Sequence, residues 1–273
     1  MQLSAPLKVY KLYSHNRHEL TPSQGLYSLS QLGVDHRDVS IGNVLLGTDP
    51  EKAAGFISDL DLSSISEEAI KAAYPNDYDT IIKQMKGGEW RTVCDYHLET
   101  TQTPFSYTLC AQGTALFMAR SLLTALTTME LDADGPTASD FTFQHRLCHD
   151  FESLIWVVVF AMMSHHRIFL ASTNPVKCER YKKVLDDCWA VHAYSNLRRC
   201  HNDMMTTGCS VDSLTMVRLW FPDPCEAAFF RGAMLLIRDQ GDGNYITYER
   251  LCALFREHMN LAKEPQTVDV ISG

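Results

Sequence analysis

Two carboxylates and a carboxamide near the start of the chain occupy positions that the pairing of two strands would bring together. Asn43 follows Asp38 by five positions and immediately precedes the apolar run Val44-Leu45-Leu46. Asp59 lies just beyond a second apolar run, Gly55-Phe56-Ile57, and a polar, turn-forming stretch separates the two runs. If the runs pair as antiparallel strands, Asn43 and Asp59 lie at the same end of the hairpin.

This set of side chains suits phosphoryl transfer. An Asp can orient and deprotonate an attacking hydroxyl, while an Asn and a second Asp can hold Mg²⁺ on the phosphates of a nucleotide. The sequence therefore predicts that Asp38, Asn43 and Asp59 converge at one site.

A helix must deliver the chain to this site. Thr21–Gln24 reads as a capping box with Pro at the first helical position, and Leu residues follow at one-turn spacing until Gly33. Ser64 with Glu67 forms another candidate capping box downstream.

The longest apolar run, Leu154 to Met163, predicts a helix that is buried on most sides, with Asp150 as its N-cap. Amphipathic helices are predicted further along, with Asp223 and Thr247 as caps for the last two, over 179–193, 224–238 and 248–260. The sequence thus predicts a mainly α fold with one small β-hairpin.

Composition limits the class of protein. The formal net charge of -9 argues against nonspecific binding to nucleic acid or to acidic membranes. Nine cysteines without a C-x-x-C pair indicate reduced thiols and an intracellular location, cytoplasmic or nuclear. No signal peptide is evident, and the longest apolar run is too short to span a bilayer. The sequence does not indicate an oligomeric state.

Two weaker patterns suggest metal sites, but each has a simpler interpretation. His145, Cys148 and His149 have helical spacing that would suit a metal, but no fourth ligand is evident, so a partly buried polar patch is preferred. The run from Asp239 to Asn244 hints at a calcium loop, although Arg238 and Gln240 would then occupy ligand positions.

Four motifs follow one another along the chain: His36 to Asn43, Asp59 to Asp61, Gly113 to Ala119, and His149 to Ser153. They resemble motifs that occur in the same order in protein kinases. With Val39-Ser40 after the Asp, and Asp61 where most kinases carry Gly, the chain is most similar to the fungal-type protein kinase family, over roughly residues 20–260.

The resemblance implies a role for each matching residue. Asp38 would be the catalytic base, in a catalytic motif completed by His36 and Arg37. Asn43 and Asp59 would bind Mg²⁺, and the ATP adenine would rest on Leu45.

The resemblance also implies roles for two regions further along the chain. Gly113–Ala119 would receive the substrate backbone, and Asp150 would hold the catalytic-loop backbone. The chain departs from the common pattern at Ser40, where many Ser/Thr kinases carry Lys, and at Arg120-Ser121, where kinases usually carry Pro-Glu.

The upper half of a kinase is not evident in this sequence. The 35 residues before His36 contain no G-x-G-x-x-G loop and no clear strand lysine. We therefore expect a kinase-like C-terminal lobe over 20–262, without an N-terminal lobe. Residues 1–19 would be a remnant or linker, 62–112 an activation-segment insert, and 263–273 a flexible tail.

Two functions follow from these observations. The first is transfer of the ATP γ-phosphate to a protein Ser or Thr once the lobe is completed, with the isolated chain inactive. The alternative is a truncated or non-catalytic pseudokinase that acts as a protein-binding module. A partial gene model would also explain the missing lobe.

Overall fold

The computed structural model describes residues 21–46, 55–60, 63–86, 115–131, 145–189, 193–241 and 244–261. The described part is mainly helical, with two antiparallel sheets of two strands each. The predicted mainly α fold is therefore confirmed, with a second small sheet that the sequence did not indicate. The expected remnant 1–19, the tail 263–273 and most of the distal insert, 87–112, lie outside the described residues.

Helix α8, Leu147–Thr173, is the centre of the core, as its apolar sequence predicts. Every residue from Cys148 to Val159 is buried, and Trp156 has no exposed surface. By length and composition alone α8 could cross a membrane, but most of that apolar stretch is buried inside the protein. Its apolar character is thus explained by its central position.

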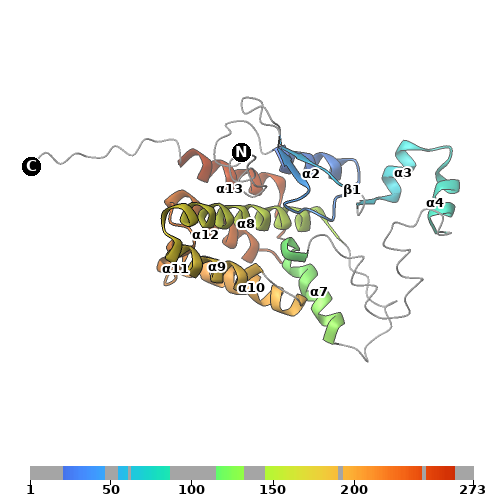
Figure 1. Cartoon of the computed structure of the whole chain (residues 1–273). Helices are drawn as coiled ribbons and strands as arrows, with labels where there is room; N and C mark the ends of the chain where they lie inside the picture. Colours follow the sequence, from blue (N-terminus) through green and yellow to red (C-terminus); the bar gives the residue numbers. More distant parts are fainter. Residues whose placement is uncertain are drawn as a thin grey trace, which may run out of the picture.

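In the described part of the chain, six further helices complete the core around α8, which crosses the middle of the molecule in Figure 1. Helices α9 and α10 lie on one side of α8 in this view, and α13 lies on the other. Their bounds are α7 Arg120–Leu131, α9 Pro175–Trp189, α10 Tyr194–Cys209, α11 Leu214–Trp220, α12 Pro224–Arg238 and α13 Tyr248–Leu261.

Helices α10 and α12 approach each other closely at a glycine. A Cβ atom placed on Gly208 would lie 2.4 Å from the Cγ atom of Met234. Because that distance is shorter than real contacts allow, a larger residue at position 208 would push the two helices apart.

The elements that carry the predicted site lie at one end of the core. Helix α2, Thr21–Gln31, precedes strand β1, Val34–Asp35. Strands β2, Val44–Leu46, and β3, Gly55–Ile57, pair antiparallel with Val44 opposite Ile57, which confirms the predicted hairpin. Strand β1 pairs with β4, Ser64–Ile65.

Some predicted caps are correct and others are not. The Asp223 carboxylate accepts bonds from the N–H groups of Cys225 and Glu226, and Thr247 Oγ1 accepts from Arg250 N, as expected. The Ser64 assignment is wrong, because Ser64 lies in β4.

The residue that caps helix α3, Glu67–Ala73, is Ser66, whose hydroxyl accepts from Ala69 N. The Asp150 assignment is also wrong, because α8 already begins at Leu147 and its N-cap is Arg146. Asp150 lies inside the first turn, where its carboxylate serves other partners.

The predicted helix over 179–193 begins earlier, at Pro175, and α10 was not predicted at all.

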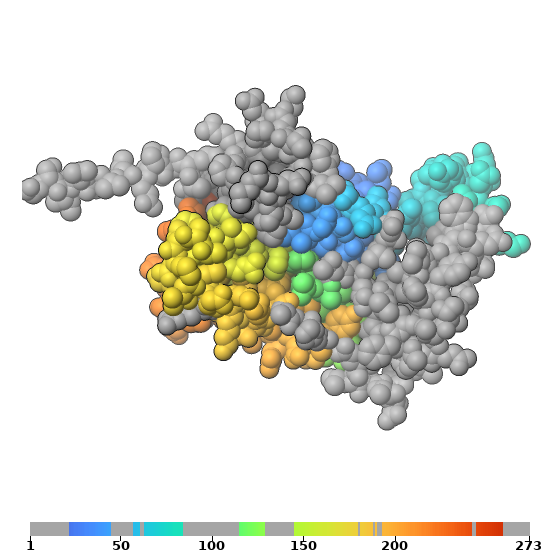
Figure 2. Space-filling view, viewed as in Figure 1, coloured from blue at the N-terminus to red at the C-terminus, as the bar shows by residue number. Residues whose placement is uncertain are grey.

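Helices α3 and α4, Tyr78–Lys86, project away from the core (Figures 1 and 2). They pack on each other, and the Tyr78 hydroxyl donates to Glu67 Oε2 at 3.0 Å. The proximal part of the insert therefore forms a helical pair of its own.

We predict that Trp156→Ala lowers the free energy of unfolding by about 3–5 kcal/mol, because it leaves a large cavity in the core. Chemical denaturation of the purified chain measures this change. Val176→Ala, on a side chain that is 68% exposed, is the control and should change stability by less than about 0.5 kcal/mol. Equal effects of the two substitutions would contradict the central role of α8.

Candidate active site

The loop from His36 to Asn43 takes its shape from the core helix. The Asp150 carboxylate accepts the N–H of His36 on Oδ2 and the N–H of Arg37 on Oδ1, both at 3.0 Å. Arg37 has a φ of 70°, a left-handed conformation that a non-glycine residue adopts at a cost. The two hydrogen bonds that Asp150 accepts stabilise this left-handed conformation. The geometry thus agrees with the role expected for Asp150, which is to hold the backbone of this loop in place.

Within this loop Asp38 and Asn43 are in direct contact. Nδ2 of Asn43 donates to the carboxylate Oδ2 and to the backbone oxygen of Asp38, each at 2.9 Å. The backbone turns between them, since the N–H of Asn43 bonds to Ser40 O at 3.1 Å. Ser40 is buried beneath the turn.

Asp59 is tied to the same loop through Ser58. The N–H of Ser58 donates to Asn43 O at 2.9 Å, which extends the β2–β3 hairpin by one bond. Nε2 of His36 lies 3.0 Å from Ser58 O, and Asp38 N donates to Nδ1 of the same ring. His36 therefore donates from Nε2 and accepts at Nδ1, and it links the backbone of Asp38 to the residue before Asp59.

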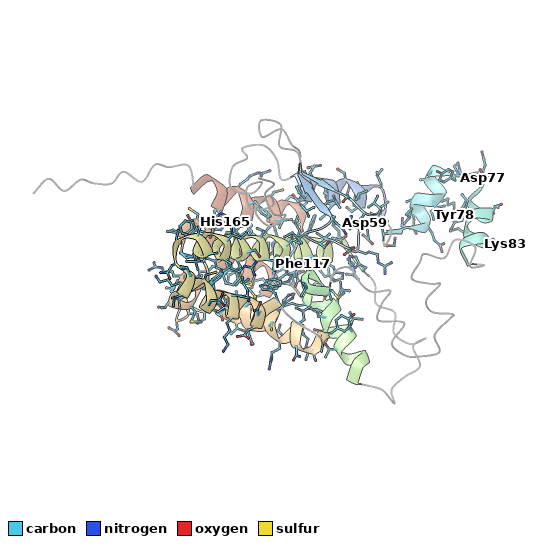
Figure 3. All side chains as sticks on the ribbon, viewed as in Figure 1. Asp59, Asp77, Tyr78, Lys83, Phe117 and His165 are labelled. Carbon is cyan, nitrogen blue, oxygen red and sulfur yellow. The ribbon has the colours of Figure 1, made fainter. Side chains whose placement is uncertain are left out.

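Asp59 also has a left-handed backbone, with a φ of 67°. Such a conformation costs of order 1–3 kcal/mol for a non-glycine residue and is concentrated at functional sites. Its carboxylate is exposed and lies toward the end of the core where α8 begins, as does Phe117, whereas His165 lies toward the opposite end (Figure 3).

The structure thus brings together the backbones of the predicted Asp38, Asn43 and Asp59 segments, with side-chain contact shown for the first two. His36 and Arg37 support this loop through backbone and ring contacts. The side chain of Leu45, together with Asp61 and Gly113-Thr114, lies outside the described residues.

The two histidines near Asp150 have structural partners. Nε2 of His145 lies 2.9 Å from Asp150 Oδ1, and Nδ1 of His149 accepts the N–H of Arg146 at 3.0 Å. Burial, with a smaller contribution from His145, lowers the pKa of His149 to about 4. The nearby Asp35 carboxyl has its pKa raised by burial, an effect that His145 opposes.

The weaker metal patterns receive no support in the part of the chain that the structure describes. No group of three or more His, Cys, Asp or Glu side chains there could hold a metal ion. Arg238 binds the Asp239 carboxylate at 2.9 Å, and Arg250 donates to the Asn244 amide oxygen at 2.7 Å. Both of these side-chain oxygens are therefore engaged by arginine cations.

The sequence did not indicate several residues that support the site. Ser58 acts through backbone contacts that carry no sequence pattern, and the spacing of His145 indicated a metal pattern rather than its contact with Asp150. Glu152 is fully buried in α8 and binds Arg120 at the start of α7. Glu152 lies within the His149–Ser153 motif, but the sequence did not indicate its partner.

Comparison with known proteins agrees with this geometry. The family model for fungal protein kinases matches residues 24–162, just over half of the chain, and that span includes the loop, the hairpin and the first part of α8. The chain therefore belongs to the fungal protein kinase family. Neither the curated proteins nor the solved structures gave a match.

Asp150→Ala should lower the free energy of unfolding by more than a lost helix cap would. It strands two backbone donors, and each unsatisfied buried donor costs about 1–3 kcal/mol. Asp223→Ala is a matched control that removes a true N-cap and should cost about 0.5–2 kcal/mol. Denaturation curves of both variants test the difference, and a smaller loss for Asp150→Ala would contradict this role.

Acid should destabilise the protein through His149 and through the buried His201, whose pKa burial lowers to about 3. Between pH 6.5 and about 4 the unfolded chain protonates these rings while the folded chain does not, so stability falls as pH falls. Each ring contributes at most about 1.4 kcal/mol per pH unit.

The test compares each variant with the wild type across this pH window. His149→Asn keeps an acceptor near Nδ1, and His201→Gln keeps a donor near Nε2. Each should flatten the slope of unfolding free energy against pH. The comparison cancels opposing contributions such as that of Glu152, whose pKa burial raises. Unchanged slopes in both variants would refute the prediction.

Proposed function

We propose that this chain is the C-terminal lobe of a protein kinase that transfers the ATP γ-phosphate to a Ser or Thr hydroxyl of a protein. The contact between Asp38 and Asn43, joined through His36 to the Asp59 segment, is the observation that carries the proposal. The preference for Ser or Thr over Tyr rests on the resemblance alone.

Asp38 would serve as the base that orients the acceptor hydroxyl and takes its proton. Nδ2 of Asn43 donates to Asp38 Oδ2 and so fixes the carboxylate in one orientation. Because that amide nitrogen is used as a donor, the amide oxygen of Asn43 is the atom left to act as a ligand.

The donor set fits Mg²⁺. An amide oxygen from Asn43 and a carboxylate from Asp59 are hard oxygen ligands, and Mg²⁺ is usually held by one or two such groups together with substrate phosphates. When bound, the ion would neutralise charge on the phosphates. The left-handed backbone at Asp59 supports a functional rather than a structural reason for this residue.

Binding of a nucleotide needs more than these residues of the C-terminal lobe. Kinases cover the phosphates with backbone N–H groups and a strand lysine from an upper lobe. Without those groups, two acidic side chains in an acidic chain would repel a polyphosphate. We therefore expect activity only where an upper lobe is supplied.

The isolated 273-residue chain should bind Mg-ATP weakly and show no measurable phosphotransfer. Supplying an upper lobe, as a longer chain or in trans, should produce phosphotransfer to a protein substrate. Asp38→Asn should then lower kcat by about 10²–10⁴-fold, because the general base is lost. Calorimetric Mg-ATP titration and a radiolabel transfer assay measure the two quantities.

Asp239→Asn, in an exposed ion pair, is the matched carboxylate-to-amide control and should leave transfer unchanged. Micromolar Mg-ATP binding by the isolated chain that Asp59→Asn removes would overturn the expected need for an upper lobe. Absence of transfer in the completed protein, with the fold intact, would favour the non-catalytic binding module.

A further inference from the structure

The segment Ala115–Arg120, which leads into α7, is held at both of its ends by buried groups. Near its start, Leu116 O lies 3.2 Å from Nε2 of His201 on α10. At its end, the N–H of Arg120 donates to Oε1 of Glu152 on α8 at 2.9 Å. Phe117 between these points is buried, so the segment is fixed by packing as well as by hydrogen bonds.

The Arg120 side chain strengthens the second attachment. Its Nε lies 3.6 Å from Glu152 Oε1, and its Nη2 donates to Ile237 O at 2.9 Å. Nη1 reaches Asn202 Oδ1 at 3.5 Å. One guanidinium therefore connects the start of α7 to α8, α10 and α12.

Glu152 is the anion of this arrangement, and its partners in the described part of the chain are donors. Besides Arg120, its carboxylate accepts from Trp156 Nε1 at 3.3 Å and from Gln240 Nε2 at 2.7 Å. A carboxylate is acceptor-only, so this set of donors suits the ionised form. Burial raises the pKa of Glu152, and the Arg120 guanidinium opposes that effect.

Trp156 joins the two attachments into one network. Its indole N–H binds Glu152, and its ring stacks on His201 with 3.9 Å between centroids. Burial keeps His201 neutral by lowering its pKa to about 3, so its Nε2–H can donate to Leu116 O. Both ends of the segment therefore depend on the same buried side chains.

We propose that Arg120 and Glu152 form a charge-reversed anchor that sets the acceptor-facing segment Ala115–Arg120 without any phosphorylated side chain. The resemblance to kinases implies that Gly113–Ala119, which overlaps this segment, would receive the substrate backbone, and kinases usually anchor that region with a Glu where this chain has Ser121. Here the cation belongs to the segment and the anion to the core helix.

The role of this segment in receiving a substrate rests on the proposed function, whereas the contacts that hold the segment do not. In many kinases a phosphorylated side chain orders the activation loop by pairing with Arg. Arg120 already has a buried counter-anion, and buried polar networks of this kind rigidify the segments they join. The segment that would receive the protein substrate is then ordered by the lobe itself. Control of activity would therefore act on nucleotide binding.

Amide hydrogen exchange on the unphosphorylated 273-residue chain tests the anchor. In the wild type, peptides covering residues 116–122 should exchange at least tenfold more slowly than in Glu152→Gln or Arg120→Met. The double variant should exchange no faster than the faster single variant, because both substitutions break one network. Asp239→Asn is the matched control on an exposed ion pair and should leave these peptides unchanged.

Milder variants keep the test decisive where Glu152→Gln does not fold. Trp156→Phe removes the indole N–H donor but keeps an aromatic ring. Arg120→Lys keeps the positive charge but loses the planar set of guanidinium donors. Both should accelerate exchange in 116–122 more than in α13. Fast exchange of these peptides in the wild type, or no local change in any folded variant, would overturn the anchor.

An activity arm separates this proposal from the proposed function. In a chain completed by an upper lobe, Arg120→Lys should raise KM for the protein substrate at least fivefold and leave KM for ATP unchanged. A completed wild type with slow local exchange but no phosphotransfer would refute the kinase function and leave the anchor intact. Phosphotransfer with an unchanged protein KM in Arg120→Lys would refute the acceptor role.

Discussion

The site depends on one buried carboxylate that does no chemistry. Asp150 accepts two backbone N–H groups from the loop that carries Asp38, and it does so from the first turn of the core helix. An acceptor that is 1% exposed cannot exchange its partners for water, so the loop and the helix must move together. The position of Asp38 is therefore set by the packing of α8.

A second layer of contacts connects this loop to the segments that carry Asn43 and Asp59. The His36 ring connects the backbone of Asp38 to Ser58, and the β2–β3 hairpin connects Ser58 to Asn43. The segments that carry Asp38 and Asp59 are thus held together by hydrogen bonds of the backbone and of the His36 ring.

Local patterns in the sequence predicted a substantial part of this structure. Alternation of apolar runs with a turn gave the hairpin, and the Asp223-Pro224 signal gave the start of α12. The apolar run around Trp156 identified the central helix. In each case the signal is a periodicity or a cap that acts within a few residues.

The parts that sequence reasoning missed depend on contacts between distant residues. Helix α10 has Ala193 as its N-cap, without a side-chain bond, so it carries no start signal. The spacing of Ser64 and Glu67 indicates a capping box, but pairing between β1 and β4 places Ser64 in a strand and leaves Ser66 as the cap. The role of Glu152 requires Arg120, which is 32 positions away.

The left-handed backbones at Arg37 and Asp59 have a consequence for mutational scanning. At most positions glycine weakens a fold, but here it would adopt the observed φ with less strain than any other residue. Glycine at position 59 should therefore preserve the fold while it removes the carboxylate. A scan of stability would show an inverted order of tolerance there, with glycine well folded and β-branched residues poorly folded. Such a profile would mark a position where the native side chain is not the one that the backbone conformation favours.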